Sequence, residues 1–109
     1  MKLLIILGQK EDAEKLFQKL TEEKFSATKF EGRSGPLLRE TVLLLVPTEE
    51  KHLRKVFSLT KEVCGKRIEY LPSEIDTLPE GQFLEMPPMP IKMGGATVFV
   101  LKIEDFKEF

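Results

Sequence analysis

Hydrophobic residues follow two different patterns along this chain. Continuous apolar runs at residues 3–7, 42–46 and 96–101 predict short strands that are buried on both faces. Elsewhere apolar residues recur every three or four positions, as in Ala13, Leu16, Phe17 and Leu20, and again in Leu53, Val56, Phe57 and Val63. This spacing predicts two amphipathic helices, over about residues 10–24 and 49–64.

Weaker signals fill in the remaining elements. Residues 25–31 and 66–71 carry enough β-branched and aromatic side chains to predict two further short strands. Thr48 precedes two glutamates and is expected to cap the second helix. Gly65 follows that helix, where a left-handed C-terminal cap is common.

The predicted order is β-α-β-β-α-β, with room for a small extra strand before the last one. This order is typical of a ferredoxin-like α+β sandwich, in which both helices cover one face of the sheet. The other face is also apolar in the first, third and last strands, so something must cover it. A second copy of the chain is the favoured cover, and the chain's own long loop is the alternative.

Two segments are expected to be loops within a single domain spanning residues 1–109. The first covers about residues 31–40 and contains two glycines. The second covers about residues 71–91, is acidic, and holds five of the seven prolines. A loop of this length in a compact domain is usually functional.

Composition narrows the classes of function. The chain has 109 residues with a net charge of −1, which argues against a nucleic-acid polymer as partner. Its apolar runs are too short for a signal peptide or a membrane helix, so a cytoplasmic location is expected. The single cysteine, Cys64, falls on an apolar helix stripe and is expected to be a buried thiol.

The residue types needed for catalysis are sparse. His52 is the only histidine and has no second metal-ligating neighbour in sequence, so neither a metal site nor any other cofactor is expected. Ser34 has no base placed to activate it. In contrast, Gly32 and Gly35 flank Arg33, an arrangement that can bind a phosphate, although these residues alone favour an ordinary exposed turn. The sequence therefore predicts a binding protein and no enzyme.

The C-terminal third carries a specific likeness. The run Gly94-Gly95-Ala96-Thr97-Val98-Phe99-Val100-Leu101 and the ending at 104–109 resemble the signature of the PII-like cyclic di-AMP receptors, as do residues 25–29 and 64–67. The resemblance implies a ferredoxin-like homotrimer that signals by binding cyclic di-AMP between subunits. It also implies that the two loops respond to the ligand.

The implied contact residues are only partly retained. Four match the family pattern, namely Thr28, Gly35, Leu37 and Phe99. Six depart from it: Lys24, Ser26, Pro36, Thr41, Pro47 and Glu108. Pro36 removes base stacking worth about 1–3 kcal/mol, and Glu108 brings a negative charge toward a dianionic ligand. Lys24, Lys29 and Arg33 are candidates to restore phosphate contacts.

Three functions therefore stay open. The first is a nucleotide sensor of the cyclic di-AMP type. The second is a ligand-independent trimeric module that docks on an unknown protein through its acidic, Pro/Met-rich loop. The third is a metal-tolerance protein of the CutA kind, which the lack of a histidine or cysteine cluster disfavours.

Overall fold

A computed structural model describes residues 1–34, 39–71, 76–77, 83–84 and 89–109. The elements of the body are β1 (Lys2–Gln9), α1 (Lys10–Glu22), β2 (Thr28–Ser34), β3 (Arg39–Thr48), the 3-10 turn η1 (Glu50–His52), α2 (Leu53–Cys64) and β8 (Ala96–Lys102). Four more strands lie between α2 and β8: β4 (Arg67–Leu71), β5 (Asp76–Thr77), β6 (Phe83–Leu84) and β7 (Met89–Met93).

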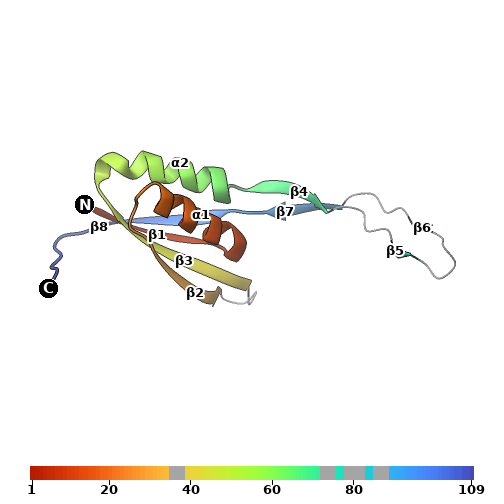
Figure 1. Cartoon of the computed structure of the whole chain (residues 1–109), viewed down its shortest axis with the longest axis horizontal. Helices are drawn as coiled ribbons and strands as arrows, with labels where there is room; N and C mark the ends of the chain where they lie inside the picture. The colour runs from red at the N-terminus through yellow and green to blue at the C-terminus, as the bar shows by residue number, and fades with distance from the viewer. Residues whose placement is uncertain (35–38, 72–75, 78–82, 85–88) are drawn as a thin grey trace.

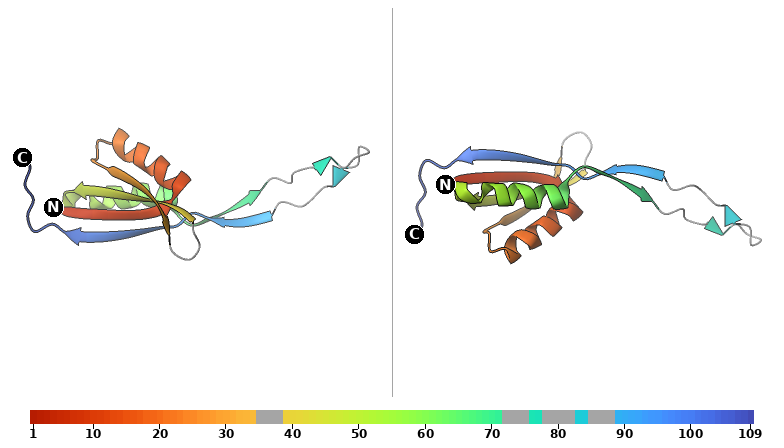
Figure 2. Two further views of the ribbon diagram at one scale, coloured as in Figure 1. Left: turned by 90° about the horizontal axis from the view of Figure 1, so that it is seen from below. Right: turned by 90° about the horizontal axis from the view of Figure 1, so that it is seen from above.

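The body is one antiparallel sheet with two helices. Its strand order is β2-β3-β1-β8, so the first strand lies in the middle beside the last one. Both helices lie against the same face of this sheet (Figures 1 and 2). The predicted α+β, ferredoxin-like fold is therefore confirmed.

The face of the sheet beneath the helices forms the core. Strand alternation directs every second residue toward this face, and Leu4, Ile6 and Leu44 are fully buried there. Leu16 of α1 and Val56 of α2 complete the packing and are also fully buried. This is the covered face.

The opposite face, called the open face below, is just as apolar. Its large side chains come from all four strands: Leu3, Ile5, Leu7, Phe30, Leu43, Leu45, Phe99 and Leu101. None of them is fully buried, and Phe30 and Phe99 are 52% and 49% exposed. The continuous apolar runs thus correctly predicted that both faces of the sheet are apolar. The two helices of the chain cover only one of these faces.

Strand β4 does not join the main sheet. It pairs with β7 instead, from Arg67↔Met93 to Leu71↔Met89. The small extra strand expected before the last strand is therefore present as β7. The two strands form a ribbon that leads away from the body, at the end opposite both termini (Figure 1). We call β4 and β7 together the arm.

Both predicted loops contain more regular structure than the sequence indicated. Strand β2 continues to Ser34 and β3 begins at Arg39, so residues 35–38 alone separate them. Within the expected loop at 71–91, β5 pairs with β6 and β7 begins at Met89. The long segment before the last strand thus includes these short strands among its described residues.

Two predicted helix caps were also wrong. Thr48 is the buried last residue of β3, and Glu49 precedes the 3-10 turn that leads into α2. Gly65 has an ordinary negative φ of −59°, since the chain passes directly into β4 without a left-handed turn. Glycine is required there for a different reason: a Cβ atom would collide with the carbonyl oxygen of Lys61.

Candidate functional site

Several of the residues expected at the ligand share the open face. The pairing register places Thr28 opposite Leu45, Leu45 opposite Ile5, and Ile5 opposite Phe99, in one row across the sheet. Thr41 lies on the same face, at the end of the sheet where β2 turns into β3. The structure therefore brings Thr28, Thr41 and Phe99 to one surface.

Thr28 and Phe99 nevertheless lie at opposite edges of the sheet. Three strand spacings separate them, or about 14 Å. Leu45 and Ile5 occupy the row between them. A ligand that contacts both residues must either lie along this row or bind where β2 of one chain meets β8 of another.

Lys29 points to the other side of the sheet. Its ammonium nitrogen lies 3.8 Å from a carboxylate oxygen of Glu14 and 3.9 Å from one of Glu31. It also lies 5.6 Å from the centre of the Phe17 ring, where a cation is attracted to the ring face. These partners hold Lys29 against α1, away from the row that contains Thr28.

Arg33 lines a small hollow at the turn end of the sheet. The hollow has a volume of about 240 Å³ and is lined by Lys10, Glu31, Gly32, Arg33, Glu40, Thr41 and Val42. Lys10 and Glu40 form an ion pair across it at 3.7 Å. Arg33 and Thr41 thus both border this hollow, among charges of both signs. Strand alternation nevertheless directs the Arg33 side chain to the helix side of the sheet, with Lys29 and Glu31, and the Thr41 side chain to the open face.

The remaining expected contacts are scattered. Gly35, Pro36 and Leu37 lie outside the described residues. Ser26, Pro47 and Glu108 are all exposed, with Pro47 opposite Leu3. Lys24 has a φ of 65°, in the left-handed region that asparagine adopts more readily than lysine.

The glycine pair before β8 is a site of close backbone approach. Gly94 and Gly95 have φ values of 80° and 97°. The Gly95 N–H donates to the carbonyl of Cys64 at 2.6 Å, and the Gly94 N–H donates to the side-chain oxygen of Gln9 at 3.4 Å. The pair therefore joins the arm to the body.

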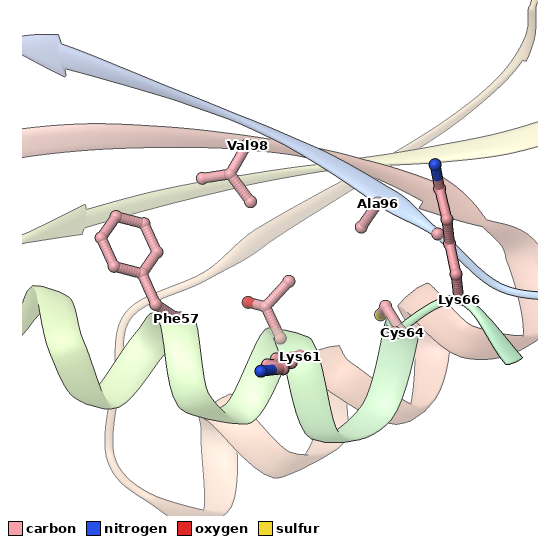
Figure 3. A pocket seen from close by; sticks show the side chains of 9 residues that line it. Phe57, Lys61, Cys64, Lys66, Ala96 and Val98 are labelled. Atoms are coloured by element: carbon pink, nitrogen blue, oxygen red, sulfur yellow. The ribbon is translucent and has the colours of Figure 1, made fainter.

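Sequence reasoning also missed a hollow between α2 and β8. It has a volume of about 260 Å³ and is lined by Phe57, Thr60, Lys61, Cys64, Gly65, Lys66, Gly95, Ala96 and Val98. Figure 3 shows Phe57 and Cys64 of α2 facing Ala96 and Val98 of β8. Helical spacing had marked Phe57 as a core residue, yet it is 40% exposed.

Cys64 is a buried thiol, as predicted. It is 1% exposed and forms no disulfide. Burial raises its pKa from 9.0 to about 11, with a further contribution from the negative charge of Asp12, against which Arg67 acts in the opposite direction. The thiol is therefore protonated at neutral pH and is a poor nucleophile.

The described part of the chain holds no group of three or more side chains suited to bind a metal ion. His52 is exposed and lies edge-on to the Phe25 ring, with centroids 6.1 Å apart. No helix among the described residues is both long enough and apolar enough to cross a bilayer.

Comparison with known proteins identifies the family to which the chain belongs. The fold is that of a small ferredoxin-like α+β protein, and the family model described as "Cyclic-di-AMP receptor" matches residues 1–109. The chain therefore belongs to the cyclic di-AMP receptor family, as the C-terminal signature had indicated.

Two solved structures resemble it. A functionally unknown protein from Pediococcus pentosaceus ATCC 25745 is 27% identical, with a TM-score of 0.79, and the alignment covers 99% of this chain and 96% of that one. A DUF3240 family protein from Shewanella baltica OS155 is 13% identical, with a TM-score of 0.58, over 99% of this chain and 94% of the other. The second likeness concerns the fold alone.

Proposed function

We propose that this chain is a non-enzymatic signalling protein that binds an adenine-containing nucleotide between neighbouring subunits of a homotrimer in the cytoplasm. Cyclic di-AMP is the first ligand to test, because the chain belongs to the cyclic di-AMP receptor family. The two segments at 31–40 and 71–91 would relay the ligand's presence to a protein partner.

The observation that carries the proposal is the position of Thr28 and Phe99 at opposite edges of one open face. When copies assemble side by side, the β2 edge of one and the β8 edge of the next approach each other. A nucleotide bound at that boundary contacts Thr28 from one chain and Phe99 from its neighbour. This placement supports a site at the subunit interface.

The open face supports the assembly. Its apolar side chains come from all four strands, and Phe99 and Leu101 are 49% and 45% exposed. Burying such side chains contributes about 25 cal/mol per Å² of apolar surface. A continuous apolar surface across a whole sheet exceeds what isolated monomers normally expose.

The proposed contacts predict weaker binding than the family pattern implies. Pro47 has no N–H to donate, and Pro36 offers no aromatic ring for stacking. Together with Ser26, Thr41 and Glu108, these substitutions can weaken affinity by several powers of ten, at about 1.4 kcal/mol per tenfold change. Arg33, which borders the hollow at the turn end of the sheet, is a candidate cation to offset part of this loss.

Calorimetric titration with cyclic di-AMP, ATP and AMP tests the proposal. We expect heat from cyclic di-AMP, with weaker binding in both Thr28→Ala and Phe99→Ala. Mixing the two variants should restore full affinity at about one in four interfaces, because an intact pair then forms across subunits. Absence of heat from all three nucleotides in a stable trimer would reject the nucleotide site.

A second candidate function is a ligand-independent trimeric module that docks on a protein partner. The projecting arm favours it, because a paired ribbon outside the body presents a surface for contact (Figure 1). Ile68 on β4 is 58% exposed. If a protein partner is captured equally well without nucleotide and with saturating nucleotide, and Ile68→Lys abolishes this capture, the docking module is favoured over the nucleotide sensor.

A further inference from the structure

The arm is attached to the body mainly at its base. Strands β4 and β7 pair with each other along their whole length. No helix or strand of the body contacts either of them to a comparable extent. The position of the arm therefore depends on a small set of contacts near Arg67 and Gly94.

The strongest of these contacts is an ion pair between the arm and α1. Two guanidinium nitrogens of Arg67 donate to the two carboxylate oxygens of Asp12, at 2.9 and 3.1 Å. The Asp12 side chain is 5% exposed, while that of Arg67 is 35% exposed. A two-pronged pair of this kind fixes the orientation of the guanidinium as well as its distance.

The returning strand is attached at the same place. Gly94 donates its N–H to Gln9, and a Cβ atom on Gly94 would collide with the carbonyl oxygen of Gly65 and lie 2.8 Å from the Arg67 guanidinium. Residue 94 is glycine because its φ of 80° is left-handed and the Gly65 backbone leaves no room for a side chain. Asp12 and Gln9 thus hold the two strands of the arm from one short segment of the body.

That segment also touches the turn end of the sheet. The backbone of Gln9 pairs with Thr41 of β3. Lys10 forms its ion pair with Glu40, the neighbour of Thr41. Residues 9–12 therefore contact the candidate nucleotide site on one side and the arm on the other.

We propose that Gln9 and Asp12 are positioning residues that fix the arm to the turn end of the sheet. A displacement at Thr41 then moves residues 9–12 and, through Gly94 and Arg67, the arm. The attachment itself is a property of the ligand-free chain, whereas the transmission of a nucleotide signal rests on the proposed function.

Distances between spin labels test the attachment without any ligand. Labels on Ser58→Cys of α2 and Pro90→Cys of β7, in a Cys64→Ala background diluted with unlabelled chain, report the position of the arm. We expect Asp12→Asn and Gln9→Ala to broaden the distance distribution by about twofold. Arg67→Lys, which keeps the charge and loses the two-pronged geometry, should broaden it less.

The matched control is Glu23→Gln, which removes a carboxylate from an exposed ion pair with Lys55 far from the arm. It should leave the distribution unchanged. Thermal melting of each variant measures its global stability. A variant that is only less stable should keep the parent distance distribution in its folded molecules, whereas a displaced arm changes that distribution. Unchanged distributions in folded Asp12→Asn and Gln9→Ala would overturn the proposal.

Cyclic di-AMP then tests the transmission. We expect saturating cyclic di-AMP to shift the mean distance in the parent chain, and to shift it less in Gln9→Ala. An equal shift in both chains would overturn the transmission through Gln9. If no nucleotide binds the parent chain, the proposed function fails, while the ligand-free distributions still decide the attachment.

Discussion

The two faces of the main sheet are built from the same kinds of residue and have opposite surroundings. Leu44 and Leu45 are neighbours in β3, yet Leu44 is fully buried under the helices and Leu45 is half-buried on the open face. Hydrophobicity alone does not distinguish them. The difference teaches that the apolar side chains of one strand can have two roles. Those on one side pack in the core of the chain, and those on the other side are available to pack against a partner.

The largest expected effect belongs to the covered face. Leu44→Ala should lower the free energy of unfolding by about 2–5 kcal/mol, because it leaves a cavity in a close-packed core. Leu45→Ala should cost much less in dilute solution, where its side chain is already partly hydrated. Denaturant titration of both variants measures the contrast, and equal losses would remove the distinction between the faces.

The next effect concerns association. Leu45→Lys should weaken self-association by at least about a hundredfold, since it places a charge in the proposed interface. Sedimentation at several protein concentrations measures the change, and circular dichroism checks that the chain stays folded. Ser58→Lys, a similar change on the exposed surface of α2, is the control. A trimer that survives Leu45→Lys would place the interface elsewhere.

The third effect uses the raised pKa of Cys64. The folded-state pKa of about 11 exceeds the ordinary value of 9.0, so the folded state binds the proton more tightly than the unfolded state. The corresponding stability is present below pH 9 and is lost as the pH rises toward 11, by about 2 to 3 kcal/mol. The free energies of unfolding of the parent chain and of Cys64→Ala, measured from pH 9 to pH 11, should therefore approach each other by about 2 to 3 kcal/mol. Parallel curves would contradict it.

The smallest effect compares neighbours in β2. Thr28→Ala should weaken cyclic di-AMP binding by about tenfold, through loss of one hydrogen bond. Lys29→Ala should change affinity less, because Lys29 lies on the helix side with Glu14 and Glu31. Calorimetry of both variants shows which face the ligand uses. A larger loss in Lys29→Ala would move the site to the helix side.

Much of the fold was predictable from residue spacing. Apolar runs and helical periods located the two helices and three strands of the main sheet, β1, β3 and β8, because burial imposes a fixed period on each element. The partner of β4 was not predictable, since a five-residue strand pairs equally well with several candidates until tertiary contacts decide. The Asp12–Arg67 pair, 55 residues apart, leaves no local signal in the sequence.

The candidate site was predictable only in part. Thr28 and Phe99 came from the resemblance to a family, and spacing alone indicated neither. Strand alternation could have separated Thr28 from Lys29 in advance, because adjacent residues in a strand face opposite sides. The hollow between α2 and β8 required the structure, because helical spacing had assigned Phe57 to the core.

The central position of β1 has a consequence for how the chain is made. On the ribosome β1 emerges early, and β3 follows within the next 40 or so residues, but the β8 partner begins only at Ala96. One edge of an apolar strand therefore has no partner until residues 96–102 have been synthesised. Such late, long-range pairing slows folding. Nascent chains halted before residue 96 should therefore be the species most dependent on chaperones.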